Sequence, residues 1–450
     1  MENICTETVQ FIKEYVEMSI SIFGLFVLPL GFILFLCPGE QLLWLTIVLS
    51  GFTGSSLVTI SGLAIQPSYY LAILWIVQQL IRNKGKIKIY HANVIRPLML
   101  FGAIAAVSIA MPILLMDKVK IMNVDGTIEK LRFSSSNITQ LIYLLFVFTF
   151  FVFLSGYMAK SNDRKDVVYK AFVFGVVAIA IVTLYQMVAY QLNLPFDTIF
   201  KTAMLRDAPS IAKGQMVFWD KRISGPCLEA SMLAYYLVAA LPVCWRISNI
   251  KLKYILTVYL IIVGIITKSS TFLVGFALWI ILEMIFYYHN NGFKIISHRK
   301  IHKDILVLCM GAIIVWGACA TALSNTENMG TMILNAVEAF GSKLRVENQS
   351  GQERSEAFQI LIEAFKEHPL LGVGYGSTRG KDLFSTWLSD IGLIGMGAFC
   401  VFMFRALKAN ISRANDQFRM ATMLVWGCML VSVPEPYNLF IWIIMALAIV

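Results

Sequence analysis

Charged residues are scarce in this sequence. Asp, Glu, Lys and Arg make up 14% of the 450 residues, whereas about a quarter of the residues are charged in an ordinary soluble domain. Hydrophobic residues account for 58% of the chain, and they gather in runs of roughly 20 residues, the length that crosses a membrane. Because backbone in lipid must satisfy its own hydrogen bonds, these runs predict an all-α, polytopic membrane helix bundle and exclude a soluble fold.

The sequence also lacks paired cysteines and any long basic run. None of its eight cysteines forms a CxxC pair, and most lie inside apolar runs. They indicate small core residues and exclude a disulfide framework. The net charge of +10 comes from short, separated clusters, so we expect no nucleic-acid partner.

The apolar runs predict about 12 or 13 transmembrane helices. The first three runs fit equally well two spans and one re-entrant segment. The predicted spans lie near residues 20–37, 41–60, 64–82, 95–116, 138–158, 168–191, 228–246, 253–268, 270–288, 304–323, 384–405, 419–433 and 436–450.

Lysine and arginine concentrate in five short segments, which the positive-inside rule assigns to the cytoplasm. These are residues 82–96, 159–170, 246–253, 289–304 and 405–419. Two long polar segments then face outward. The chain divides into N-terminal transmembrane helices (1–191), an outer loop (192–227), central transmembrane helices (228–323), a large outer loop with a surface helix (324–383) and C-terminal transmembrane helices (384–450).

The first outer loop ends in a charged turn. In KRISGPCLEA, Arg222 precedes a Ser-Gly-Pro turn and Glu229 stands where the next membrane helix begins. Arg222 fits either a snorkelling residue or a functional one. Glu229 fits either a helix-end charge, which the helix dipole favours, or a functional carboxylate.

The second outer loop contains an amphipathic segment. Apolar residues at helical spacing over 353–368 predict a short helix at the outer surface, which Pro369 and Gly372 would end. Arg354 begins this helix and His368 ends it. Arg354 is either solvated or functional, and His368 either caps the helix or takes part in chemistry.

Four pieces of the sequence, in this order, resemble the Wzy-type O-antigen polymerases and the related O-antigen ligases. The resemblance is close over 218–450 and is one of pattern before that. The pieces are RISG (222–225), the polar stretch TKSST (267–271), the Arg354-led helix that closes with HPLLGVGYG (368–376), and Gly-Leu-Ile-Gly (392–395). The resemblance implies a GT-C-like glycosyltransferase fold of membrane helices in the bacterial inner membrane, with the active site facing the periplasm. It also implies a reaction without metal or cofactor.

Two departures favour a polymerase over a ligase. Ligases typically carry a His-Asn pair where this sequence has Lys381 and Asp382. They often place an arginine in the polar stretch, where this sequence has Ser270, with Lys268 nearby.

The resemblance implies that the substrate is an oligosaccharide linked to undecaprenyl diphosphate, with membrane lipids and a chain-length regulator protein as further partners. We expect Arg222 and Arg354 to converge on the diphosphate, because the forked guanidinium group matches phosphate oxygens. Lys268 is a further candidate for phosphate contact. A general base must take the proton of the acceptor hydroxyl, and the candidates are Glu229, His368 and Glu435, which lies between two prolines in VPEPYN.

A transporter or flippase for the lipid-linked unit is the alternative of a different class. It predicts inverted repeats and charges at mid-membrane on broken helices. The sequence shows no such repeat, and few charges lie inside its apolar runs.

Overall fold

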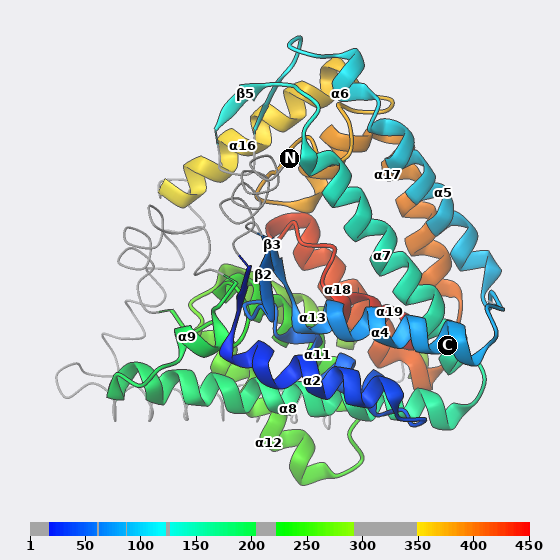
Figure 1. Ribbon diagram of the computed structural model, residues 1–450, viewed down its shortest axis with the longest axis vertical. Coiled ribbons are helices and arrows are strands. Elements are labelled where there is room, and N and C mark those ends of the chain that lie inside the picture. Colours follow the sequence, from blue (N-terminus) through cyan, green and yellow to red (C-terminus); the bar gives the residue numbers. More distant parts are fainter. Residues whose placement is uncertain (1–17, 61–62, 87, 123–126, 204–221, 292–348) are drawn as a thin grey trace, which may run out of the picture.

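The computed structural model describes residues 18–60, 63–86, 88–122, 127–203, 222–291 and 349–450 (Figure 1). Most of these residues are helical, which confirms the all-α class. In this part of the chain, five helical segments are long and apolar enough to cross a membrane. They are Ala92–Leu114 (α5 at Ala92–Ser108 with α6 at Met111–Leu114), α7 (Ser135–Met158), α8 (Asn162–Leu192), α13 (Ser270–Asn291) and α17 (Leu383–Lys408).

The other described helices are shorter. They are α2 (Ile22–Leu36), α3 (Gln41–Val48), α4 (Pro67–Arg82), α9 (Asp197–Phe200), α11 (Ala230–Trp245), α12 (Ile250–Ile266), α16 (Gln349–Glu367), α18 (Asp416–Ser432) and α19 (Leu439–Ile449), with 3-10 turns η1 (Leu49–Gly51) and η3 (Arg413–Asn415).

Most predicted spans coincide with a helix. The runs at 138–158, 168–191 and 253–268, for example, are α7, α8 and α12. The prediction at 41–60 is wrong as a single span, because α3 ends at Val48 and is followed by η1 and then by strand β2. The predicted span at 304–323 lies outside the described residues.

Five three-residue strands were not predicted. β1 (Met18–Ile20), β2 (Val58–Ile60) and β3 (Leu63–Ile65) form an antiparallel sheet, and β4 (Lys120–Met122) pairs with β5 (Ile128–Lys130) in a hairpin. Strands of this length carry too few residues to show the alternation by which a strand is recognised in a sequence.

Two apolar helices form the centre of the bundle. Every residue of α19 from Leu439 to Ile449 is buried, as are 14 of the 16 residues of α11, which packs against α18, α13 and α12. A helix that is apolar on every side is expected in such a position. Around this centre, α5 lies beside both α7 and α17 on one flank of the molecule (Figure 1).

Helix α16 lies outside this bundle, next to β4 and to the first part of α17 (Figure 1). The predicted helix and its stop before Pro369 are confirmed. Ala357, Leu361 and Ala364 are buried on one face. The hairpin strand β4 and neighbouring apolar residues cover part of that face. The expected position of the helix at the outer surface of the membrane remains a prediction.

Candidate functional site

The glycine-rich loop after α16 (HPLLGVGYG, 368–376) and the Gly-Leu-Ile-Gly segment (392–395) form one structural unit. Gly392 interrupts α17 with φ 61° and ψ −164°, which frees backbone groups on both sides of the break. The freed carbonyl of Ser389 accepts a hydrogen bond from the Val373 amide (2.8 Å), and that of Asp390 accepts one from the Gly374 amide (2.9 Å). The loop thus fills the break in the helix and joins the two motifs in space.

The side chain of Asp390 organises the next part of the loop. Its carboxylate accepts hydrogen bonds from the Gly376 amide (2.8 Å), the Thr378 amide (3.0 Å) and the Thr378 hydroxyl (2.8 Å). Asp390 is 2% exposed, and a buried polar group requires such satisfied hydrogen bonding. These bonds fix the backbone directly before Arg379.

The start of α7 fixes the same loop from another side. The Asn137 side-chain amide donates to the Tyr375 carbonyl (2.8 Å) and to the Ser377 hydroxyl (2.9 Å). The hydroxyls of Tyr375 and Tyr437 are 2.8 Å apart. This last contact joins the loop to the link between α18 and α19.

Arg379 and Glu435 form an ion pair at this junction. The Arg379 side chain is 36% exposed and that of Glu435 is 18% exposed. Burial raises the pKa of Glu435, the positive charge of Arg379 opposes that rise, and the negative charge of Glu229 adds to it. The carboxylate is therefore a stronger base than an ordinary glutamate, while the guanidinium holds it in place.

Glu229 joins the cluster because the two central helices begin at the same place. Glu229 is the N-terminal cap residue of α11, and Glu435 lies three residues before Asn438, the cap residue of α19. The side-chain amide of Asn438 bonds the Tyr235 hydroxyl of α11, which ties the two helix starts together. Helix N-termini favour negative charge, so these ends suit two carboxylates. We call Glu229, Arg379 and Glu435 the charged cluster.

The turn between Arg222 and Glu229 is clamped into the protein. The Gln186 side-chain oxygen, on α8, accepts from the amides of Ser224 (3.0 Å) and Gly225 (2.7 Å). The Lys201 ammonium donates to the Ser224 hydroxyl (2.6 Å) and to the Cys227 carbonyl. Burial lowers the pKa of Lys201 to about 8, although the charges of Cys227, Asp197 and Glu229 raise it.

The clamp gives a testable expectation for Gln186→Leu. Gln186 is fully buried, and leucine would leave two buried amides without an acceptor. We expect a loss of about 2–4 kcal/mol in stability, seen as a lower melting temperature of the purified protein. Tyr190→Phe is the matched control, because it leaves the Gln186 acceptor in place and removes the Tyr190 hydroxyl, which accepts from the Gln186 amide nitrogen (3.0 Å) and donates to the Asp197 carboxylate (3.0 Å). Equal melting temperatures for both variants would contradict this role of Gln186.

The other predicted site residues occupy different surroundings. Arg222 is exposed at the start of the clamped turn, and Arg354 is exposed near the start of α16. His368 is half-buried just after α16. Lys268 is exposed between α12 and α13, with φ 51°. The convergence of Arg222 and Arg354, and the roles assigned to His368 and Lys268, remain predictions.

The sequence analysis did not identify two charged residues of the site, Arg379 and Asp390. Arg379 follows the glycine-rich loop directly and its partner Glu435 lies 56 residues further along the chain, so nothing local indicates the pair. Asp390 did carry a signal. It is a carboxylate inside an apolar run, and such residues within membrane segments tend to be functional or to order a functional site.

Residues 255–390 match the sequence model of a family described as O-Antigen ligase. The matched range begins in α12 and ends in α17, and it contains the polar stretch, Arg354, the glycine-rich loop, Arg379 and Asp390. Arg222, Glu229 and Glu435 lie outside it. No curated protein matches the chain. The chain is thus a membrane protein that carries an O-antigen ligase family segment at residues 255–390.

Proposed function

We propose that this protein is an O-antigen polymerase of the bacterial inner membrane, with its active site on the periplasmic side. It transfers a growing glycan from undecaprenyl diphosphate to the non-reducing end of a new lipid-linked repeat unit. The observation that carries this proposal is the charged cluster, in which a half-buried ion pair and a second carboxylate meet beside the loop of the O-antigen ligase family segment.

The reaction breaks the bond between the anomeric carbon of the donor glycan and the diphosphate oxygen. A hydroxyl of the acceptor sugar forms the new glycosidic bond, its proton passes to a base, and the lipid diphosphate leaves with the bonding electrons. Of the three candidate bases we favour Glu435, because burial raises its pKa and Glu229 reinforces that effect. In this proposal the negative charge of Glu229 helps to raise the pKa of the base, Glu435.

The leaving diphosphate needs positive charge around it. Bidentate guanidinium groups suit phosphate oxygens, and preorganised charge lowers the barrier most where negative charge develops. Arg222 and Arg354 are the proposed ligands for the diphosphate. Arg379 contacts Glu435 through one nitrogen, Nη2, of a group that carries five N–H donors. It therefore suits a place between the base and the diphosphate.

The departure from the ligase pattern at Lys381 and Asp382 supports polymerisation. Lys381 is exposed. The Asp382 carboxylate caps α17, where it accepts from the Ser385 amide (2.7 Å) and the Ser385 hydroxyl (2.7 Å). Neither position supplies the imidazole that a ligase would have there. The family description itself favours the second candidate, a ligase that transfers the glycan to lipid A core.

Deleting the gene separates these two candidates. Loss of a polymerase should leave lipopolysaccharide with single repeat units on its core, because ligation continues without chain growth. Loss of a ligase should leave a bare core while polymers accumulate on the carrier lipid. Electrophoresis of lipopolysaccharide together with analysis of the lipid-linked glycans distinguishes the outcomes, and a bare core would overturn the polymerase proposal.

Arg222→Ala and Arg354→Ala should each lower chain elongation by about a hundredfold, the range expected for losing one group that stabilises developing charge. Arg222→Lys and Arg354→Lys should be nearly as inactive, because lysine lacks the forked donor geometry. Elongation is measured with purified protein and lipid-linked repeat units.

Arg132→Ala is the control for these arginine variants. Its side chain is 69% exposed and pairs with Asp117 at the surface, so elongation should stay near the level of the unmodified protein. Normal chain lengths in both Arg222→Ala and Arg354→Ala would remove these residues from the site.

A further inference from the structure

A basic hollow lies at the end of α7 opposite the charged cluster. Ser136 and Gln140, near the start of α7, line the small pocket beside Arg379, whereas Gly156 and Tyr157 line this second hollow. Gly156 lies sixteen positions after Gln140 along the helix, which corresponds to about 24 Å. The hollow has a volume of about 340 Å³, and it lies in the region that the charge pattern assigns to the cytoplasmic side.

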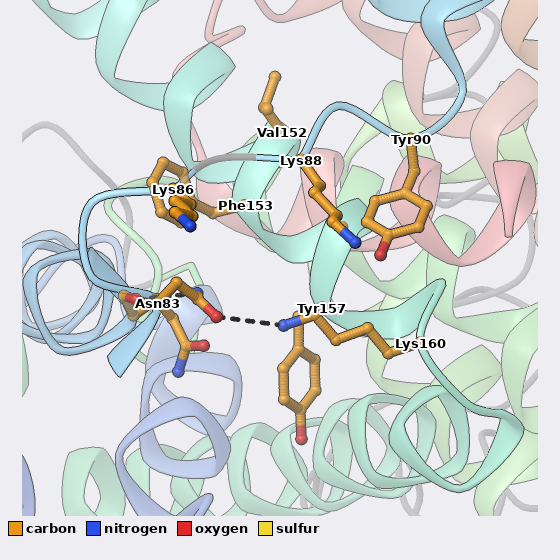
Figure 2. A pocket seen from close by; sticks show the side chains of 10 residues that line it. Asn83, Lys86, Lys88, Tyr90, Val152, Phe153, Tyr157 and Lys160 are labelled. Atoms are coloured by element: carbon orange, nitrogen blue, oxygen red, sulfur yellow. Dashed lines mark hydrogen bonds between the residues drawn. The ribbon is translucent and has the colours of Figure 1, made fainter. Parts of the chain in front are cut away.

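Three lysines surround the hollow. Lys86 and Lys88 belong to the segment after α4, and Lys160 follows α7. Figure 2 shows their side chains around one space, and the Lys160 ammonium donates to the Asn83 side-chain oxygen at 3.5 Å. No carboxylate forms an ion pair with these lysines among residues that the structure describes.

The positive charges affect one another. Partial desolvation, together with the charges of Arg164 and Lys88, lowers the pKa of Lys160. Glu40, whose carboxylate accepts from the Tyr157 hydroxyl, lines the adjoining hollow but forms no ion pair with these lysines among the described residues. Three cations around one space repel each other, and an anion between them would relieve that repulsion. A group with several acceptor oxygens suits the site best, because each ammonium offers three donors and the Asn83 side chain stands beside them.

The remaining walls of the hollow combine apolar and amphipathic side chains. Val152 and Phe153 come from the membrane helix α7, and Tyr90 and Tyr157 add aromatic rings (Figure 2). Such a hollow can accept the glycerol part of a lipid next to its phosphate. Basic pockets between membrane helices on the cytoplasmic side are suited to anionic lipid headgroups for this reason.

We infer that the hollow lined by Lys86, Lys88 and Lys160 binds a phosphate group, carried by an anionic phospholipid headgroup or present as free phosphate. The site is separate from the proposed polymerase site, because it lies at the other end of α7. It would anchor the cytoplasmic ends of α4 and α7 to one another through the bound anion.

The experiment compares the full-length protein with a triple variant, Lys86→Gln, Lys88→Gln and Lys160→Gln. Both are placed in nanodiscs of phosphatidylcholine, with or without phosphatidylglycerol, and native mass spectrometry then counts the retained phosphatidylglycerol. In a second arm, binding of inorganic phosphate is titrated by the thermal stabilisation it causes. The triple variant should bind the phosphate group roughly tenfold more weakly or worse, since each basic residue near the surface contributes substantially to attraction.

The matched control removes three charges elsewhere, with Lys170→Gln, Lys251→Gln and Arg405→Gln, all exposed and in segments assigned to the cytoplasm. It should bind like the unmodified protein. If the pocket variant loses phosphatidylglycerol that the unmodified protein and the control retain, the ligand is a lipid headgroup. If the pocket variant differs only in its thermal stabilisation by inorganic phosphate, the ligand is a soluble anion. The inference fails if the pocket variant matches the control in both arms, or if the unmodified protein binds neither probe.

Discussion

Glu435→Gln is expected to lower chain elongation by 10² to 10⁴-fold, the range that general base catalysis typically contributes. Glutamine has nearly the shape of glutamate and can still accept a hydrogen bond from Arg379, but it cannot take a proton from the acceptor hydroxyl. The initial rate of elongation with purified protein and saturating lipid-linked repeat units measures the effect. Substrate binding should change far less than the maximal rate.

Asp117→Asn is the matched control for Glu435→Gln. Asp117 pairs with Arg132 at 3.0 Å, but the two side chains are 36% and 69% exposed. Exposed ion pairs contribute little to stability, so this carboxylate-to-amide change should leave elongation unchanged. A Glu435→Gln protein that is folded and elongates chains at the normal rate would exclude Glu435 as the base and leave Glu229 and His368.

The pH dependence of elongation gives an independent check on Glu435. Burial raises its pKa and Glu229 adds to the rise, while Arg379 opposes it. Because the base must be ionised, the rate should fall as pH falls through a value above that of an ordinary glutamate. Neutralising Glu229 with Gln removes one of the two raising influences, so it should move this limb of the profile to lower pH.

Gly392→Ala should prevent correct folding or lower stability by about 3 kcal/mol or more. At φ 61° and ψ −164° the backbone occupies a region that is open essentially to glycine alone. A Cβ atom would also stand 2.4 Å from the Leu370 carbonyl oxygen, which belongs to the loop that fills the break in α17. The yield of monodisperse protein and its melting temperature after detergent extraction report the effect.

Gly397→Ala provides the contrast on the same helix. A Cβ atom there would meet nothing within 4 Å. Since alanine favours helix over glycine by about 1 kcal/mol, this variant should be as stable as the unmodified protein or slightly more stable. If Gly392→Ala behaved like Gly397→Ala, the proposed joining of the two motifs through the break at Gly392 would be wrong.

The transmembrane helices followed from the sequence because their apolar runs are long and bounded by charge. The 41–60 run misled because it is apolar enough for a span, yet its second half contains Gly51, Gly54 and a Ser-Ser pair. There the chain leaves the helix, and the Gly54 amide bonds the Pro226 carbonyl (2.8 Å). That partner lies far away in the sequence, and no local pattern encodes it.

For the same reason, only part of the charged cluster could be predicted from the sequence. Glu229 and Glu435 drew attention because each stands beside an apolar span. Arg379 did not, because its role depends on the fold of a loop held by Asn137 and Asp390, which come from two other parts of the chain. Charge and hydrophobicity along a sequence locate the ends of membrane helices, whereas the pairing between those ends appears only once the helices are packed.

The enclosure of α11 has a consequence for how this protein is made. Its chief neighbour, α18, begins at Asp416, nearly two hundred residues later in synthesis than Glu229. During that interval α11 can rest against lipid, because nearly all of its side chains are apolar, but Glu229 still lacks Glu435, its partner carboxylate in the charged cluster, which follows α18. Nascent chains that stop before α18 should therefore insert and yet stay open to quality-control proteases.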